Sequence, residues 1–166
     1  MITLPSGASL RRPDVPLSAA DVAGMRLAIS QAERARAAGE VPVGAVVMRD
    51  GVVLGQGHNE VKLRLDPTAH AERLAIAEAL ATARLDRLSG ATLYVTLEPC
   101  AQCAGAIVLG KVDRVVFGAW DPKAGMAGSI HDLLRHPSLN HRCEVVAGVL
   151  AEECGALLQA FFSGLR

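Results

Sequence analysis

The fold of this chain is decided by residues 92–118, which are TLYVTLEPCAQCAGAIVLGKVDRVVFG. Residues 92–97 alternate polar and apolar side chains as a strand does, and residues 99–109 follow a helical period that begins at a proline. Residues 114–118 are apolar and β-branched, which predicts a second strand. A strand, a helix and a strand in this order predict a βαβ unit whose two strands are parallel.

Two cysteines stand at the start of the predicted helix. Cys100 and Cys103 are three positions apart, so they share one face of the helix, and the positive end of its dipole favours thiolates. Taken alone, this spacing fits a thiol redox motif as well as a metal site. The other two cysteines, Cys143 and Cys154, have no neighbour of ligand type and are expected to be small buried residues.

A second short motif is His70-Ala71-Glu72. Its histidine and glutamate are two positions apart and do not share a helix face, so they can converge only if a helix meets a metal with its first turn. We expect His70, Cys100 and Cys103 to bind one Zn²⁺, which leaves the fourth tetrahedral position to a water. Glu72 would stay unligated and move the proton of this water.

The joint occurrence of the two motifs decides between the alternatives. A lone histidine such as His70 would more often be a helix cap or a core residue, and a lone Cys-x-x-Cys could be a redox motif. A redox or structural-zinc module would leave Glu72 without a task and would need a fourth ligand. The combination therefore favours a hydrolytic zinc site.

The remaining elements are predicted from periodicity and turn signals. Asp50-Gly51 between β-rich runs indicates a hairpin, and Asp66 followed by Pro67 indicates the start of a helix. Helices are expected at 18–38, 66–83 and 130–134 and from 152 onward, strands at 43–48, 52–55 and 144–146, and a loop at 57–66.

Length and charge restrict the class of protein. The 166 residues fit one domain, which we place at 17–166 after a flexible segment at 1–16. Seventeen basic and seventeen acidic residues give no net charge, so no global field attracts RNA, DNA or a membrane. Four cysteines without an export signal or a long apolar run lead us to expect a cytoplasmic protein.

From residue 19 to 162 the chain resembles the bacterial tRNA-specific adenosine deaminases of the cytidine-deaminase-like superfamily. The resemblance is carried by GEVPVGA at 39–45, DPTAHAE at 66–72, TLYVTLEPC at 92–100, CAGA at 103–106, RVVFGA at 114–119 and NHR at 140–142. It implies a three-layer α-β-α sandwich with a five-stranded mixed sheet. It also implies a zinc-dependent homodimer, with one ion per subunit, that deaminates the wobble adenosine of a tRNA anticodon, that of an arginine tRNA, to inosine.

The resemblance also assigns two substrate contacts. Asn59 matches an asparagine that hydrogen-bonds the target nucleoside, although a turn residue could also stand there. Asp121 matches a loop aspartate near the substrate sugar, although it could simply form a turn before Pro122. Trp120 departs from the polar residue common in relatives, and it could stack on a nucleotide or pack at a dimer interface.

The expected partner is a tRNA anticodon stem-loop, with no DNA and no membrane. The chain ends in Phe161-Phe162-Ser163-Gly164-Leu165-Arg166 and lacks the basic tail of many relatives. Phosphate contacts could come from a cluster of loop cations, although each alone fits a solvated charge: Lys62, Arg64, Lys123 and Arg142. The alternative function is deamination of a free base or nucleoside such as guanine or cytosine, which zero net charge would suit.

Overall fold

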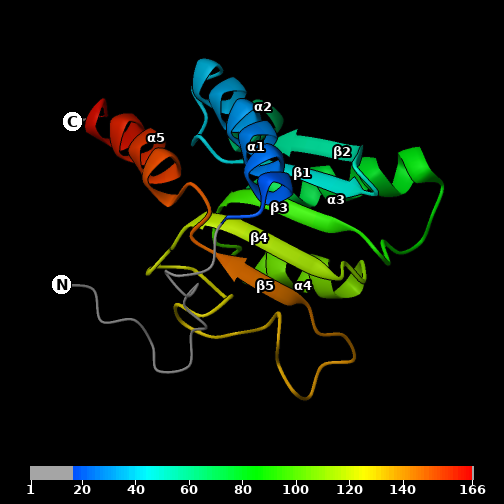
Figure 1. Cartoon of the computed structure of the whole chain (residues 1–166). Helices are drawn as coiled ribbons and strands as arrows, with labels where there is room; N and C mark the ends of the chain where they lie inside the picture. The colour runs from blue at the N-terminus through cyan, green and yellow to red at the C-terminus, as the bar shows by residue number, and fades with distance from the viewer. Residues whose placement is uncertain (1–16, 166) are drawn as a thin grey trace.

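The structure, a computed structural model, describes residues 17–165; the predicted flexible segment at 1–16 lies outside them. It contains one five-stranded sheet in the order β2-β1-β3-β4-β5 (Figure 1). The strands are β1 (Gly44–Arg49), β2 (Val52–His58), β3 (Thr92–Leu97), β4 (Arg114–Ala119) and β5 (Glu144–Ala147). The helices are α1 (Ala19–Ala37), α2 (Val61–Arg64), α3 (Ala71–Ala83), α4 (Ala101–Leu109) and α5 (Ala151–Ser163).

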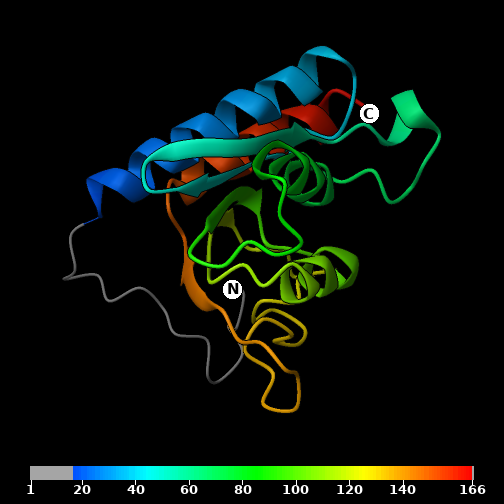
Figure 2. The same ribbon diagram turned by 90° about the vertical axis from the view of Figure 1, so that its right-hand side faces the viewer.

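Helices cover both faces of the sheet. Figures 1 and 2 show α1 and α5 on one face and α3 and α4 on the other. The alternation of side chains along β1 explains this arrangement: Val46 belongs to the core cluster that contains Met25 of α1, whereas Val47 belongs to the cluster that contains Ala75 of α3. The predicted three-layer α-β-α sandwich is therefore confirmed.

The sheet is mixed because its two halves are built differently. β1 and β2 form the predicted antiparallel hairpin, and β1 also pairs antiparallel with β3. β3 and β4 are parallel and are joined through α4, so the predicted βαβ unit is confirmed. β5 adds a further parallel strand beside β4. The carboxyl ends of β3 and β4 consequently meet at one edge of the sheet.

The predicted start of the second helix was wrong. We predicted that a helix would begin at Asp66, but α3 begins at Ala71. The Asp66 carboxylate instead accepts hydrogen bonds from the amide and the hydroxyl of Thr68, which close a local turn. His70 then keeps an extended backbone at the N-cap of α3. The predicted loop at 57–66 is also shorter, since β2 runs to His58 and α2 occupies Val61–Arg64.

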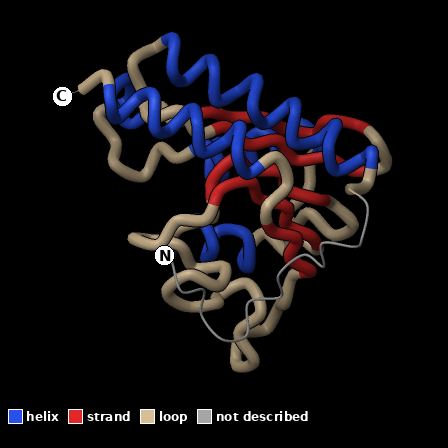
Figure 3. The backbone as a smooth tube through the Cα atoms, turned by 60° about the vertical axis from the view of Figure 1, so that its left-hand side comes forward, coloured by secondary structure: helices blue, strands red, loops and turns tan. Residues whose placement is uncertain are grey.

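The prediction of a helix at 130–134 is also wrong. Its backbone makes a β-bridge between Ala127 and Asp132, and the amide of Leu133 donates to the carbonyl of Met126. These contacts fold the segment back on itself and take the amides that a helical turn would use. Figure 3 draws most of the connection from β4 to β5 as loop.

An ion pair between buried Asp21 and half-buried Arg114 holds the start of α1 against the sheet. Ser18 caps the helix, and the carboxylate of Asp21 turns to the sheet, where it accepts hydrogen bonds from Arg114 at 2.8 Å and from the Tyr94 hydroxyl at 3.1 Å. Asp21 is 5% exposed, and the hydrogen bonds from Arg114 hold the pKa of its carboxyl below the usual value. The far end of α1 leads into Gly39 and Glu40, next to the candidate site.

No helix among residues 17–165 combines the length and the apolar composition needed to cross a bilayer.

Glycines let helices approach the sheet. A Cβ built on Gly44 of β1 would lie 2.1 Å from the Ala28 carbonyl oxygen and 2.3 Å from the Ala32 amide nitrogen, both backbone atoms of α1. We predict that Gly44→Ala lowers the free energy of unfolding by at least about 2 kcal/mol, because a helix backbone cannot move aside as a side chain can. Urea denaturation followed by circular dichroism would measure the change.

Gly155, on α5, provides the matched control. A Cβ on Gly155 meets no atom within 4 Å. Gly155→Ala should therefore raise the free energy of unfolding by about 0.5 to 1 kcal/mol, the usual gain of alanine over glycine in a helix. Equal stability of the two variants would contradict the role assigned to Gly44.

Candidate active site

The two predicted metal motifs meet at the ends of two helices. His70 is the N-cap residue of α3 and Cys100 is the N-cap residue of α4, and Cys103 lies one turn into α4. The ligand atoms of these three residues all lie within 4.8 Å of one another. The predicted convergence of the two helix N-termini is confirmed, and it brings together residues 30 and 33 positions apart in the sequence.

The distances between the ligand atoms fit a tetrahedral ion. The Nδ1 atom of His70 lies 3.5 Å from Sγ of Cys100 and 3.6 Å from Sγ of Cys103. Two ligands on a tetrahedral Zn²⁺, with Zn–N and Zn–S bonds of usual length, are about 3.6 Å apart. The side chains present therefore suit zinc in both chemistry and spacing.

Neighbouring side chains hold the cluster in this arrangement. Gln102 donates one hydrogen bond to the Thr68 carbonyl oxygen at 3.0 Å and another to Sγ of Cys103 at 3.7 Å, which links the turn before α3 to α4. Hydrogen bonding with the Cys103 thiol lowers the pKa of Cys100 to about 3, and the same contact raises the pKa of Cys103. One of the two sulfurs is thus already poised as a thiolate ligand.

Glu72 lies in the first turn of α3, beside the cluster. Its side chain is 4% exposed and burial raises the pKa of its carboxyl to about 7, while hydrogen bonding with its own backbone and with Cys103 acts in the opposite direction. A carboxyl group of this kind can take and return a proton near neutral pH. Glu72 thus lies in the first helical turn, where the predicted end-on approach of this helix to the cluster requires it.

Asn59 is buried between β2 and α3. Its Oδ1 atom accepts a hydrogen bond from the Ala71 amide at 3.0 Å, so it satisfies an amide in the first turn of α3. The backbone amide of Asn59 donates to the Val43 carbonyl oxygen. The residue is therefore more than the turn residue that we weighed as the alternative, and the cavity that it lines is the one that contains His70 and Glu72.

Asp121 lies across the same cavity. Its Oδ1 atom accepts hydrogen bonds from the amides of Lys123 and Ala124, so the turn that we weighed for it is present. The residue nevertheless lines the cavity together with Glu72. Trp120 points elsewhere: its ring packs edge to face against Phe117, with 4.9 Å between the ring centres.

The cavity has a volume of about 290 Å³. It is lined by Glu40, Val41, Val43, Asn59, Val61, Lys62, His70, Glu72, Leu97, Glu98, Cys100, Asp121 and Ala124. Sequence analysis missed Glu40 and Glu98, which are 3% and 1% exposed. The position of Glu98 between an apolar strand and Pro99 hinted at burial, but its hydrogen-bond partners lie more than twenty residues away and leave no local signal.

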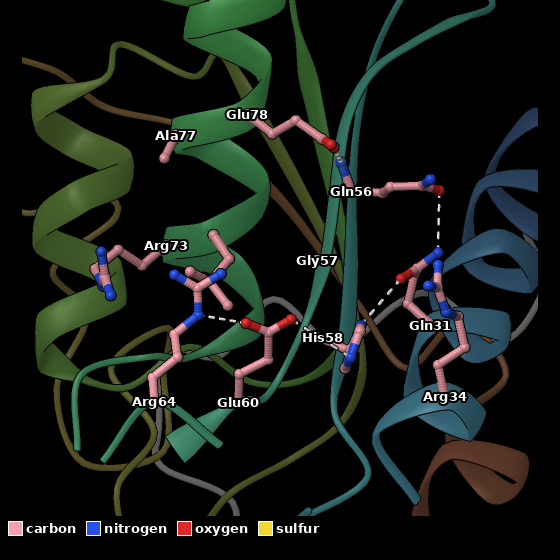
Figure 4. A pocket seen from close by; sticks show the side chains of 11 residues that line it. Gln31, Arg34, Gln56, Gly57, His58, Glu60, Arg64, Arg73, Ala77 and Glu78 are labelled. Atoms are coloured by element: carbon pink, nitrogen blue, oxygen red, sulfur yellow. Dashed lines mark hydrogen bonds and ion pairs between the residues drawn. The ribbon is translucent and has the colours of Figure 1, made fainter. Parts of the chain in front are cut away.

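A larger cavity of about 440 Å³ lies beside the edge strand β2, as Figure 4 shows. Its polar side chains mainly satisfy one another: Glu60 pairs with Arg64 and with His58, and Gln31 donates to Gln56. None of the predicted metal or substrate residues lines this cavity. We therefore do not assign the active site to this cavity, although it is the larger of the two.

Three of the four candidate phosphate contacts are already engaged within the chain. Arg64 pairs with Glu60, Lys62 donates to the Gly39 carbonyl oxygen, and Arg142 donates to the Pro137 carbonyl oxygen. Lys62 also lies 5.8 Å above the Phe161 ring, which brings the end of α5 to the rim of the cavity. Of these cations, only Lys62 lines the cavity itself.

Comparison with known proteins identifies the family. Residues 18–119 match the model of the cytidine and deoxycytidylate deaminase zinc-binding region. The chain is 51% identical over 142 residues to a tRNA-specific adenosine deaminase of Bacillus subtilis, an alignment that covers 86% of this chain and 88% of the relative. The chain belongs to the tRNA-specific adenosine deaminase family. A second member, from Haemophilus influenzae, is 46% identical over 86% of this chain and 83% of its own length.

Solved structures agree with the fold. A chain from a study of A-to-I editing by tRNA:A34 deaminases at the wobble position of transfer RNA matches with a TM-score of 0.79 and 39% identity, over 82% of this chain and 99% of that one. A guanine deaminase from Nitrosomonas europaea matches with a TM-score of 0.76 and 23% identity, over 92% and 89% of the two chains. The second likeness is one of fold alone.

The ligand assignment predicts the metal content of variants. His70→Ala and Cys103→Ser should each lower bound zinc from about one ion per chain to a small fraction of that, because two protein ligands cannot hold the ion tightly. Cys143→Ala is the control, since its buried thiol donates to the Val112 carbonyl oxygen, in a part of the core that lies outside the cluster. Elemental analysis of the purified proteins would measure this.

Full zinc in either ligand variant would contradict the assignment. A reversible Cys100–Cys103 disulfide in a wild-type protein that binds no zinc would instead support the redox alternative.

Proposed function

We propose that this protein deaminates adenosine to inosine by hydrolysis at the wobble position of a tRNA anticodon, with an arginine tRNA as the expected substrate. The observation that carries the proposal is one cavity, lined by two members of the His-Cys-Cys cluster, by the buried carboxyl group of Glu72 and by the side chains of Asn59 and Asp121. Substantial identity to tRNA-specific adenosine deaminases over most of the chain supports the choice of substrate.

His70, Cys100 and Cys103 would hold one zinc ion, which when bound supplies Lewis-acid activation of a water molecule. Glu72 takes a proton from this water while the water oxygen forms a bond to C6 of adenine. Glu72 then gives this proton to N1 of the ring. A second proton, from the new hydroxyl, passes through Glu72 to the amino nitrogen, and the C6–N bond breaks to release ammonia and leave inosine.

The other polar side chains would orient the nucleoside. Oδ1 of Asn59 is bound to the Ala71 amide, so its amide nitrogen is the group offered to the base. Oδ1 of Asp121 is held by its own turn, so Oδ2 is the oxygen offered to a ribose hydroxyl. Val41, Val43 and Leu97 give the cavity an apolar wall that limits the access of bulk water.

The anticodon suits this pocket for an energetic reason. A base must leave its stack to enter a cavity of this size, and the bases of an anticodon loop are unpaired, so little energy is needed to extract one. The target adenosine would therefore be presented by the loop rather than pulled from a duplex.

A homodimer in the cytoplasm completes the proposal. Leu65 and Leu109 are 91% and 79% exposed, and they are apolar surface that a second copy could cover. The mass of the purified protein in solution tests this part, and a monomer at all concentrations would contradict it.

Glu72→Ala tests the proton transfers. The variant should retain its fold and its zinc, because Glu72 is not a ligand, but it should form inosine at least about 100-fold more slowly, which is the lower end of what a general acid–base contributes. Inosine would be counted by nuclease digestion and chromatography of a treated stem-loop. The matched control is Glu152→Ala, an exposed glutamate in the first turn of α5, which should leave the rate unchanged. Wild-type activity in Glu72→Ala would refute the mechanism.

A substrate panel tests the RNA. Purified protein would be given an arginine tRNA anticodon stem-loop with adenosine at the wobble position, and separately free adenosine, guanine and cytosine. The stem-loop should be deaminated with a kcat/KM at least about 100-fold above that of any free compound, because remote contacts help to orient the base. The balanced charge of the chain favours the rival, a free-base deaminase, and preference for guanine or cytosine would establish it.

A further inference from the structure

Glu98 is the most thoroughly bound carboxylate near the cavity. It follows the last residue of β3, precedes Pro99, and is 1% exposed. Its oxygens accept hydrogen bonds from the amides of Asp121 (2.9 Å), Ala127 (3.0 Å) and Ser129 (2.9 Å), and from the Ser129 hydroxyl. A buried charge is costly unless it is satisfied in this way, so the contacts are a requirement of the fold at this point.

All four donors come from one loop. The segment 121–129 follows β4 and has no helix or strand of its own in the described structure. Some of its amides bond back to Asp121, whereas those of Asp121, Ala127 and Ser129 depend on Glu98. Glu98 supplies partners near both ends of the segment, and the neighbouring Pro99 carbonyl oxygen accepts from the Met126 amide. Without these acceptors the loop would lose the bonds that tie it to the end of β3.

The loop also passes unusually close to the carboxylate. A Cβ on Gly125 would lie 2.2 Å from the Glu98 carboxyl group. Any side chain at position 125 would push the loop away, so the approach requires glycine. The carboxylate and the loop are therefore shaped to each other.

The hydrogen bonds between Glu98 and the loop include one to Asp121, the proposed substrate contact. The amide of Asp121 is bound to Oε2 of Glu98, and the side chain of Asp121 is in turn fixed by the amides of Lys123 and Ala124. Glu98 is also two positions before Cys100. It thus connects the strand end that carries a metal ligand to the loop that carries Asp121.

We propose that Glu98 is a positioning residue: its carboxylate holds the 121–129 loop so that Asp121 meets the substrate ribose at a fixed distance from the metal cluster. This inference rests on the proposed function. A direct part in proton transfer or metal binding does not fit the geometry, because four donors occupy the four lone-pair positions that a carboxylate offers.

Glu98→Gln tests the proposal with little change of shape. Its amide nitrogen must face at least one loop donor, which turns an attraction into a repulsion. We expect KM for the anticodon stem-loop to rise about tenfold, kcat to fall less than about threefold, and zinc content to stay at the wild-type value. A large fall in kcat with unchanged KM, or loss of zinc, would overturn the proposal.

The Asp121→Ala background separates positioning from general destabilisation. If Glu98 acts through Asp121, adding Glu98→Gln to Asp121→Ala should change KM by less than about twofold. An equal tenfold rise in both backgrounds would show that Glu98 acts by another route and would overturn the proposal.

Ser129→Ala gives a second variant should Glu98→Gln fail to fold. It removes only the hydroxyl donor, and we expect a KM increase of about threefold. Ser138→Ala, an exposed serine of the same β4–β5 connection, is the control and should not change KM. Equal KM values for these two serine variants would count against the proposal.

Hydrogen exchange provides a readout that needs no substrate. The amides of Asp121, Ala127 and Ser129 should exchange at least about tenfold faster in Glu98→Gln than in the wild type. Unchanged exchange would overturn the proposal. Failure of the proposed function would instead appear as a wild-type protein that does not deaminate the stem-loop, while the exchange result stayed as expected.

Discussion

His70 and Cys100 occupy N-cap positions of two different helices, and this shared constraint organises the molecule. A helix end can present a side chain to a point in space only if the whole helix is held at the correct angle. The packing of α3 and α4 on the same face of the sheet, the turn made by Asp66, and the bridge from Gln102 to Thr68 all serve this alignment. The sheet matters to the chemistry chiefly because it keeps two helix ends together.

Three buried carboxyl groups show how surroundings divide structural roles from chemical ones. Asp21 is compensated by an arginine, and Glu98 by four hydrogen-bond donors from a loop. Glu72 is buried as deeply but has weaker compensation, so burial raises the pKa of its carboxyl to about 7. At Asp21 and Glu98 the free-energy cost of burying a carboxylate is thus offset by its partners. At Glu72 the cost is only partly offset, and it appears as a raised pKa that suits proton transfer.

Much of this arrangement could be predicted from local patterns. The βαβ unit, the hairpin at Asp50-Gly51 and the convergence of His70 with the two cysteines follow from periodicity, turn chemistry and ligand spacing. The start of α3 was misplaced because Asp66 and Pro67 carry the signals of a helix cap, and only the tertiary contact from Asn59 to the Ala71 amide shows where the helix begins. Glu98 was missed for a related reason: its partners lie more than twenty residues away, beyond the reach of any local rule.

The two ends of the described chain differ in their relation to the cavity. α1 starts beside Arg114 and Glu144, at the amino-terminal ends of β4 and β5, whereas the cavity lies at the carboxyl ends of β3 and β4. The last turn of α5 brings Phe161 against Lys62 at the rim. A protein domain tethered ahead of α1 would therefore leave the approach of a large substrate open, and one tethered behind α5 would be held where that substrate must arrive. A fusion partner placed after α5 would obstruct the substrate or contact it, whereas one placed before α1 would do neither.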